Sequence, residues 1–348
     1  VLAPPLLTTE TTSFNEQMRF LYEGPDALQL GLEPGALDED RIAVLRGVVQ
    51  ETDGTPISVA QVTVHGDKAL GATYTREDGA FDIVVNGGDQ VTLRIAHDAY
   101  LPAHRRLETP TEAYTNLAPV VLVAVDGEVT QVGLGEGTTI ATAQGTPTVD
   151  GFGDRQATVI IPGGTSATMR LADGTEMPLE TLSFRATEYT VGDEGSSRMP
   201  ASLPPSSLYT YAVELSADEA LDVGANRVDF DTPLAFYERN FLNFPVGTPV
   251  PTGYYDRDLA AWIPSNNGLV VEVLSIDDGL ADLDLTGDGV AAGPEDLENL
   301  GVTDEELAEV AALYLPGDTL WRAPIAHFTP CDINFPVYFP SDGEMPGE

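Results

Sequence analysis

The chain has 348 residues, 42% of them hydrophobic, which is enough for two or three domains that each bury a core. Its 56 acidic and 16 basic residues give a formal net charge of -40. A surface of that sign repels phosphate backbones and anionic headgroups, so the composition excludes nucleic-acid binding and electrostatic membrane binding, and divalent cations are the natural counter-ions.

Other features of the composition leave the chain's cellular setting open. Lys68 is the only lysine, and an acid-rich, lysine-poor surface is also typical of adaptation to high salt. Cys331 is the only cysteine, which excludes an intramolecular disulfide and a cysteine-rich zinc site. No apolar run approaches the roughly 18 to 20 residues of a membrane span, so we expect no membrane insertion. The start at Val1, without a leader, fits either a processed chain or a piece of a longer one.

The first third of the chain is rich in strand and turn signals. Residues 1–41 are expected to be an extended N-terminal segment, and residues 42–50 read as a strand. Asp53-Gly54 and Asn86-Gly87 are turn and hairpin dipeptides, and the runs beside them alternate apolar and polar residues. Short strands at nearly regular spacing predict a β-sandwich over 42–133.

Residues of this region resemble the transthyretin-like, carboxypeptidase regulatory-like domain. The matching positions are Gly47, Asp53, Gly54, Pro56, Val59, Val62, Thr73, Thr75, Asp78, Gly79, Phe81 and Tyr100. Ala99 stands where that domain usually has Gly. The resemblance implies the fold and says little of function, because such domains serve as accessory modules on many secreted proteins.

The middle of the chain, 134–275, is predicted to be a second β-rich domain, with a Gly, Ser and Pro-rich surface loop at 191–207. Five aromatic residues follow among Pro-Gly turns: Phe241, Phe244, Tyr254, Tyr255 and Trp262. They fit either buried packing or an exposed carbohydrate platform. The overall prediction is a mainly β fold of tandem β-sandwich domains with a calcium loop and short C-terminal helices.

An Asp-rich loop within 276–318 carries the best chemical motif. Hard Ca²⁺ prefers six to eight oxygens, alternate residues of a curling loop point inward, and Gly at position 6 permits the sharp turn. The candidate ligands are Asp284, Thr286, Asp288, the Val290 carbonyl and Glu295, with Gly289 at position 6. Asp277, Asp278 and Asp282 are alternative ligands, including a register that starts at Asp282, and a solvated acidic turn is the alternative to a metal site.

Helices are expected to flank this loop only on its C-terminal side. Pro294 suits a first helical position, and Thr303 with Glu306 forms a capping box for an amphipathic helix that ends at Pro316-Gly317. With no helix before it, the loop resembles a dockerin-like or isolated calcium loop. Residues 319–348 are predicted to be a closing segment.

A larger resemblance runs through the chain. The segments 20–49, 75–88, 240–271, the Asp-rich loop and 320–336 are, in this order, similar to the region that precedes the repeat shell of bacterial RHS/YD-repeat proteins, which are related to the teneurins. That family usually has Trp where Cys331 stands and Cys where Ile333 stands. The resemblance implies a secreted or cell-surface protein whose partner is a downstream YD-repeat shell, often enclosing a C-terminal toxin, with this segment covering or plugging one end.

Enzyme motifs are absent from the sequence. His65, His97, His104 and His327 lie in no H-E-x-x-H pattern, and neither a G-x-S-x-G nor a Walker sequence occurs. We therefore expect a non-enzymatic structural module, stabilised by calcium, with a cell-surface partner as a further possibility. The alternative is a secreted adhesion or carbohydrate-binding β-sandwich protein that exposes its aromatic residues.

Overall fold

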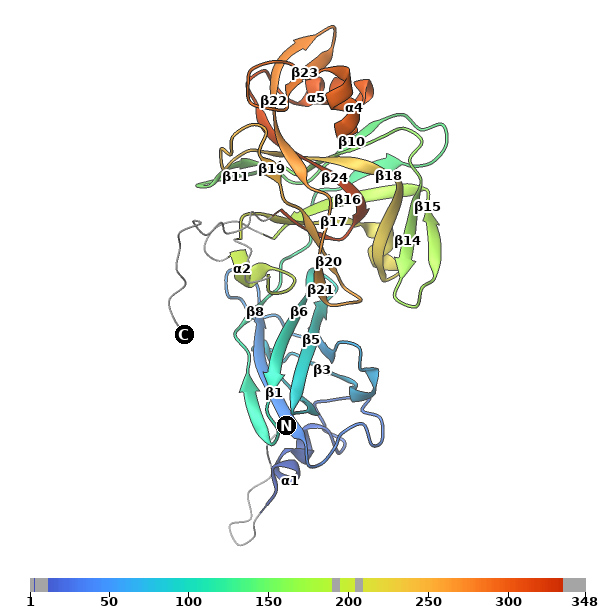
Figure 1. Cartoon of the computed structure of the whole chain (residues 1–348). Coiled ribbons are helices and arrows are strands. Elements are labelled where there is room, and N and C mark those ends of the chain that lie inside the picture. The colour runs from blue at the N-terminus through green and yellow to red at the C-terminus, as the bar shows by residue number, and fades with distance from the viewer. Residues whose placement is uncertain (1–2, 4–11, 190–194, 204–208, 334–348) are drawn as a thin grey trace. The chain divides into compact units, whose positions relative to one another are not determined.

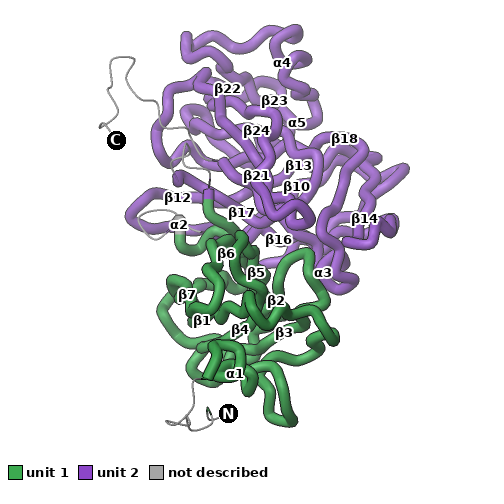
Figure 2. The backbone as a smooth tube through the Cα atoms, turned by 60° about the horizontal axis from the view of Figure 1, so that its bottom comes forward, with its two compact units in different colours: residues 1–125, 196–202 green, residues 126–195, 203–348 purple. Residues whose placement is uncertain are grey.

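The computed structural model describes residues 3, 12–189, 195–203 and 209–333. It divides into two compact units, residues 1–125 with 196–202 and residues 126–195 with 203–348 (Figure 2). Several sheets and a few short helices make up both, which confirms the mainly β, sandwich-like fold. Within the described ranges, no helix is both long and apolar enough to span a membrane.

Unit 1 is a sandwich of two four-stranded sheets. One has the order β4-β1-β7 with β8 beside β1, and the other has the order β3-β2-β5-β6. Leu45 on β1 pairs with Ile83 on β4, and both face Leu93 and Ile95 on β5 in one apolar core. The bounds are β1 (Ile42–Gln50), β2 (Gln61–Val64), β3 (Ala72–Tyr74), β4 (Ala80–Asn86), β5 (Asp89–His97), β6 (Tyr100–Thr109), β7 (Ala113–Asn116) and β8 (Val120–Val121), with the 3-10 helix η2 (Lys68–Leu70).

The N-terminal segment is folded against this sandwich, although an extended segment was expected over 1–41. Helix α1 (Phe14–Met18) and the 3-10 helix η1 (Arg19–Leu21) bury Met18 and Leu21 on the outer face of β1 and β4. The Gln29 amide accepts a hydrogen bond from Val84 N (2.7 Å) and donates to Val84 O (3.0 Å). It therefore satisfies backbone groups as a neighbouring strand would.

A short return of the chain completes unit 1. Helix α2 (Gly195–Arg198) is followed by Met199, which is wholly buried, and the backbone N–H of His104 on β6 donates to Pro200 O (2.6 Å). The loop predicted at 191–207 was expected to be a surface excursion, but its residues 195–203 include this buried contact. Residues 191–194 and 204–207 lie outside the described residues.

Unit 2 contains two larger sheets and a separate hairpin, β11–β12. The nine-stranded sheet has the order β10-β13-β18-β24-β22-β19, with β14, β15 and β23 paired at its side, and the six-stranded sheet has the order β21-β20-β25-β17-β16-β9. Strand β9 pairs with β16 and so belongs to unit 2, whereas the predicted boundary at 133 placed it with the first sandwich.

The strands of unit 2 are β9 (Thr130–Gly133), β10 (Ala141–Gln144), β11 (Thr148–Asp150), β12 (Gly153–Arg155), β13 (Thr158–Ile161), β14 (Ala167–Leu171), β15 (Glu176–Leu179), β16 (Thr181–Glu188), β17 (Ala212–Ala217), β18 (Ala225–Arg239), β19 (Pro249–Val250), β20 (Gly253–Asp256), β21 (Ala261–Pro264), β22 (Gly268–Asp277), β23 (Leu280–Asp284), β24 (Thr319–Phe328) and β25 (Pro330–Asp332). Helix α3 (Asp218–Asp222) precedes β18. Phe184, Phe236 and Trp321 lie in the core that both sheets share.

A helical layer covers the other face of the nine-stranded sheet. Helices α4 (Pro294–Leu300) and α5 (Asp304–Leu313) lie beside the β22–β23 hairpin (Figure 1). Leu307 and Val310 of α5 pack with Tyr237 and Val271 of the sheet in a second core of this unit. The Asp-rich loop joins β23 to α4, so it connects the sheet to its helical cover.

Candidate functional site

The predicted calcium loop begins where β23 ends, at Asp284. The β22–β23 hairpin turns at Asp278 and Gly279, both with positive φ (49° and 84°), and returns the chain to Asp284. After the loop, Gly293 precedes Pro294, which starts α4 as expected from its fixed φ. Asp277 and Asp278 therefore lie at the far tip of the hairpin from Asp284.

The Asp284 carboxylate organises the loop. It is 1% exposed and accepts hydrogen bonds from the backbone N–H groups of Thr286 (2.8 Å), Gly287 (2.8 Å) and Gly289 (2.7 Å). Burial opposes its ionisation, but these hydrogen bonds outweigh burial and lower the pKa of Asp284. Gly287 and Gly289 have φ of 81° and 76°, so the curl depends on glycine at both positions.

The other acidic residues among the predicted ligands, Asp282, Asp288 and Glu295, do not gather around Asp284. Asp288 accepts from Val290 N (3.0 Å), and Asp282 accepts from the Ser275 hydroxyl (2.6 Å) on β22. Glu295 is exposed in the first turn of α4. Among the described residues, no three His, Cys, Asp or Glu side chains form a metal-binding group.

A surface hollow of about 390 Å³ lies beside this loop. Thr286, Asp288 and Asp296 are among its lining residues, but Asp284 and Glu295 are not. The sequence template did not point to Asp296, which is the residue after the expected position 12. Thr286 remains beside Asp284, with its hydroxyl 3.4 Å from the Asp284 carboxylate.

A buried ion pair anchors the helices that follow the loop. Arg322 on β24 donates to both oxygens of Glu306 on α5 (2.7 and 2.9 Å), and the Tyr237 hydroxyl donates to the same carboxylate (2.6 Å). Arg322 also donates to the carbonyls of Leu300 (2.9 Å) and Gly301 (3.3 Å), at the C-terminal end of α4. One guanidinium group therefore ties both helices to the sheet.

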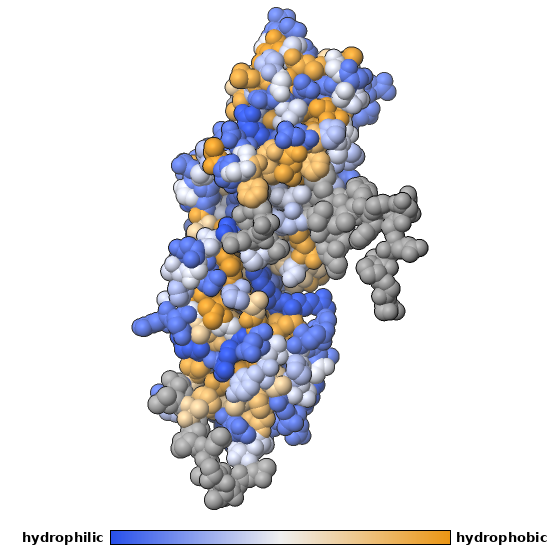
Figure 3. Space-filling model, turned by 90° about the vertical axis from the view of Figure 1, so that its left-hand side faces the viewer, coloured by the Kyte–Doolittle hydropathy of each residue, from blue (hydrophilic) through white to orange (hydrophobic). Residues whose placement is uncertain are grey.

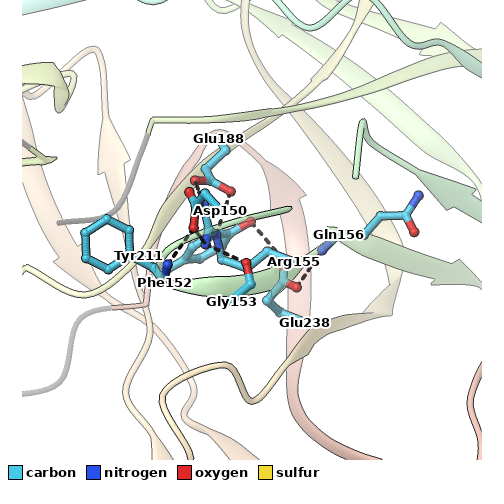
Figure 4. A network of polar contacts seen from close by, with 8 residues as sticks. All are labelled: Asp150, Phe152, Gly153, Arg155, Gln156, Glu188, Tyr211 and Glu238. Carbon is cyan, nitrogen blue, oxygen red and sulfur yellow. Dashed lines mark hydrogen bonds and ion pairs between the residues drawn. The ribbon is translucent and has the colours of Figure 1, made fainter. Parts of the chain in front are cut away.

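A second polar network joins the β11–β12 hairpin to the sandwich (Figure 4). Arg155, whose side chain is 1% exposed, forms paired hydrogen bonds with Asp150 (2.9 and 2.7 Å) and with Glu188 on β16 (3.1 and 3.0 Å). Its guanidinium carbon lies 5.2 Å from the centre of the Phe241 ring. This arrangement fixes the base of the hairpin.

Glu238 lies beside that network, wholly buried (Figure 4). It accepts hydrogen bonds from Gln156 N (2.8 Å), Arg239 N (2.8 Å) and the Tyr211 hydroxyl (3.0 Å). Burial raises the pKa of Glu238 to about 7, and these hydrogen bonds only partly offset it. Glu238 was not among the residues predicted from the sequence. The sequence does carry a signal for it. Glu238 is a charged residue directly after an apolar run in β18, two positions after Phe236 and therefore on the same strand face.

The four histidines lie apart from the calcium loop. His65 and His104 form a ring pair (5.0 Å) in unit 1, and His97 lies 5.2 Å from Tyr100. His327 in unit 2 lies 4.3 Å from the Tyr254 ring, and burial lowers the pKa of His327.

The aromatic residues predicted either as core or as a platform are mainly packed inside. Tyr255 is 2% exposed, and Phe241 and Phe244 pack against the core around Trp321. Cys331 and Ile333, where the family usually has Trp and Cys, are both buried in the same core. Burial raises the pKa of the Cys331 thiol to about 12.

Comparison with known proteins identifies one domain of the chain. Residues 37–122 match the family model of the Teneurin TTR-like domain. Human Teneurin-4 is 26% identical over 125 residues, which are 36% of this chain and 4% of that protein. Teneurin-m of Drosophila melanogaster is 37% identical over 108 residues, 31% of this chain and 4% of that protein.

Solved structures superpose only weakly. The 3-chlorocatechol 1,2-dioxygenase of Rhodococcus opacus covers 28% of this chain and 66% of its own, at 12% identity and a TM-score of 0.23. A streptococcal ancillary pilin covers 52% and 60%, at 8% identity and a TM-score of 0.22. These values carry no functional argument. The chain thus spans about 4% of the length of the teneurins that it matches, and its residues 37–122 are similar to their TTR-like domain.

Proposed function

We propose that this chain is a non-enzymatic structural module of a secreted or cell-surface RHS/YD-repeat protein, where it covers or anchors one end of the repeat shell. The teneurin TTR-like domain is the observation that carries this proposal, since proteins named teneurins share it. The ordered segments from 20–49 to 320–336 that resemble the same family support it. The downstream shell of the same precursor is the proposed partner.

The use of charge in unit 2 supports a structural role. Arg155, Arg322 and Arg257 are each hydrogen-bonded to buried or half-buried carboxylates. Paired charges of this kind hold elements in register, and a general acid or base would instead need access to a substrate. The packed positions of Phe241 and Tyr255 favour this role over a carbohydrate platform made of the same aromatic residues.

One face of the surface also supports a structural role. On the face drawn in Figure 3, hydrophobic residues are interspersed with hydrophilic ones. A covering module needs a rigid scaffold more than a deep cleft, and each unit supplies one in a sheet structure with its own apolar core.

Calcium completes the proposal as a structural ion. Asp284, Thr286, Asp288, the Val290 carbonyl and Glu295 remain the proposed ligands, with Asp282 as the alternative start. Binding requires Asp288 and Glu295 to turn toward Asp284, which would draw the first turn of α4 toward the end of β23. Since Arg322 holds the C-terminal end of α4 and the helix buries no residue of its own, we expect only its first turn to shift.

The test begins with the reading frame beyond residue 348, where YD repeats are expected. The repeat region is then produced without residues 1–348, and the purified 348-residue chain is added. We expect a one-to-one complex by size-exclusion chromatography with light scattering. A reading frame without YD repeats, or a shell that does not bind this chain at micromolar concentration, would overturn the proposal.

A further inference from the structure

A small polar hollow in unit 2 is separate from the calcium loop and from the Glu238 network. It encloses about 110 Å³, and its lining comes from β14, β18, β20, the turn between β20 and β21, and the residue between β24 and β25. Residues of both sheets therefore contribute to it. The lining includes Arg170, Arg227, Arg257, Tyr254, Asp256 and Asp258.

Three guanidinium groups are held in place around this hollow. Arg170 and Arg227 both pair with Asp229 (3.0 and 2.7 Å), and Arg170 also pairs with Glu176 (2.7 Å). Arg257 pairs with Glu214 (2.7 Å), whose side chain is 3% exposed. Among the residues that the structure describes, these bonds use only part of the five N–H donors of each group, so donors remain for a ligand.

The carboxylate acceptors of the lining are also held in place by hydrogen bonds. Asp256 Oδ1 accepts from the backbone N–H groups of Asp258 (2.9 Å) and Leu259 (2.9 Å), which leaves Asp256 Oδ2 for a ligand. Asp258 accepts from Asn226 Nδ2 (2.5 Å), another lining residue. The Tyr254 ring stands edge-on to His327 and supplies an apolar wall with a hydroxyl at its end.

The charge balance selects the ligand class. The three guanidinium groups face five carboxylates, those of Asp256 and Asp258 in the lining and those of Asp229, Glu176 and Glu214 behind it, which leaves two negative charges in excess. The excess negative charge repels a free anion, and the guanidinium groups repel a cation. A neutral polyol suits the alternation of fixed donors and acceptors, because each hydroxyl both donates and accepts.

We propose that this hollow binds one neutral sugar ring at the end of a glycan. Neighbouring hydroxyls of the ring donate to Asp256 and accept from the guanidinium groups of the lining, those of Arg170, Arg227 and Arg257. The apolar ring face lies on Tyr254. Leu259, 67% exposed in the adjoining turn, gives the next sugar an apolar support. The site does not depend on the repeat shell or on calcium.

Saturation-transfer NMR on the whole chain tests the proposal, with the methyl glycosides of glucose, galactose, mannose and N-acetylglucosamine as probes. At least one should receive saturation at millimolar concentration, with or without EDTA. Asp256→Asn keeps an oxygen for the turn but replaces the charged acceptor, and should weaken binding about tenfold, which corresponds to about 1.4 kcal/mol.

Two further variants keep the test decisive. Arg170→Gln, at a side chain that is 41% exposed, should also weaken binding and replaces Asp256→Asn if that variant melts early. Arg41→Gln removes an exposed pair with Asp89 in unit 1 and should leave binding unchanged. Absence of saturation for all four sugars, equal binding by the hollow variants, or displacement of the sugar by sulfate or acetate would overturn the proposal.

Discussion

The two units differ in the residues that they bury. Between the sheets of unit 1 the core is apolar, with Leu45, Phe81 and Ile83 at its centre. Its buried Asp82 pairs with arginines that are 40% and 50% exposed. In unit 2, by contrast, Glu238 and the pair of Glu306 with Arg322 lie inside the fold. An apolar core tolerates the loss of one polar partner, whereas a buried charge left without its partner does not.

This contrast can be followed optically, because Trp262 and Trp321 are the only two tryptophans and both belong to unit 2. Tryptophan fluorescence therefore reports the unfolding of unit 2. Calorimetry of the whole chain reports both units. Comparison of the two signals therefore assigns each change in stability to one unit.

The largest effect is expected from Arg322→Met. The substitution leaves Glu306 buried without a cation and the carbonyls of Leu300 and Gly301 without a donor. Breaking a buried pair in this way costs about 3–5 kcal/mol of unfolding free energy. Urea unfolding followed by tryptophan fluorescence measures it.

The control in unit 1 is Arg46→Met, which removes a half-exposed partner of Asp82. Its cost should stay near the ~0–1 kcal/mol of exposed pairs. A second variant, Arg322→Met with Glu306→Gln, should recover part of the loss, since it removes the unpaired charge. Equal costs for Arg322→Met and Arg46→Met would break the contrast between the units.

The next effect concerns pH and Glu238. Because its folded pKa is raised from 4.5 to about 7, the native state holds a proton that the unfolded chain releases. Unit 2 should therefore lose stability as pH rises from about 4.5 to about 7, by about 3 kcal/mol, with no further loss above that range. Glu238→Gln removes this component while keeping an oxygen for Gln156 N and Arg239 N.

The measurement compares urea unfolding of both proteins between pH 4.5 and pH 8. Other carboxyl groups contribute to each curve, so the difference between the two proteins isolates Glu238. That difference should change through the stated range and then become constant. A difference that is the same at every pH would show that Glu238 is not the titrating group.

Calcium should act on unit 2 alone. At a hundred times its dissociation constant, calcium should stabilise this unit by ~2.7 kcal/mol relative to EDTA, because it binds the folded loop. Asp288→Ala with Glu295→Ala should abolish the shift, and Asp277→Ala, at the distant hairpin tip, should keep it. Stabilisation of the double variant by calcium, or no stabilisation of either protein, would refute the assignment.

Local patterns predicted unit 1 better than unit 2. Turn dipeptides such as Asp53-Gly54 and Asn86-Gly87, with alternating strands beside them, define hairpins within a few residues. They cannot reveal that α1 and Gln29 cover the sheet from outside, because that contact joins residues 55 positions apart. Tertiary packing decided the position of residues 12–41.

The candidate sites show the same limit. The calcium template identified a loop that does curl around Asp284, but side-chain direction in the first turn of α4 placed Asp296, and not Glu295, at the neighbouring hollow. The sugar hollow draws residues from 170 to 329, and no short motif links them. Residue spacing predicts a site whose side chains come from one turn of the chain. A site whose side chains come from several strands can be recognised only once the fold is known.

The smallest predicted effect returns to unit 1, where Val59 has a φ of 63°. A β-branched residue is strained in this left-handed region, at a cost of roughly 1–2 kcal/mol relative to glycine. The side chain is 66% exposed, so little burial is lost on its removal. Since glycine also has greater freedom in the unfolded chain, Val59→Gly should stabilise unit 1 by a net ~0.5–1 kcal/mol, or roughly 3–6 °C.

Gly79→Ala is the opposite control, because its φ is 75° and an added Cβ would lie 2.4 Å from Val49 O. Calorimetry should show the first variant raising and the second lowering the melting transition that tryptophan fluorescence does not report; a shift of the tryptophan transition would instead place the effect in unit 2.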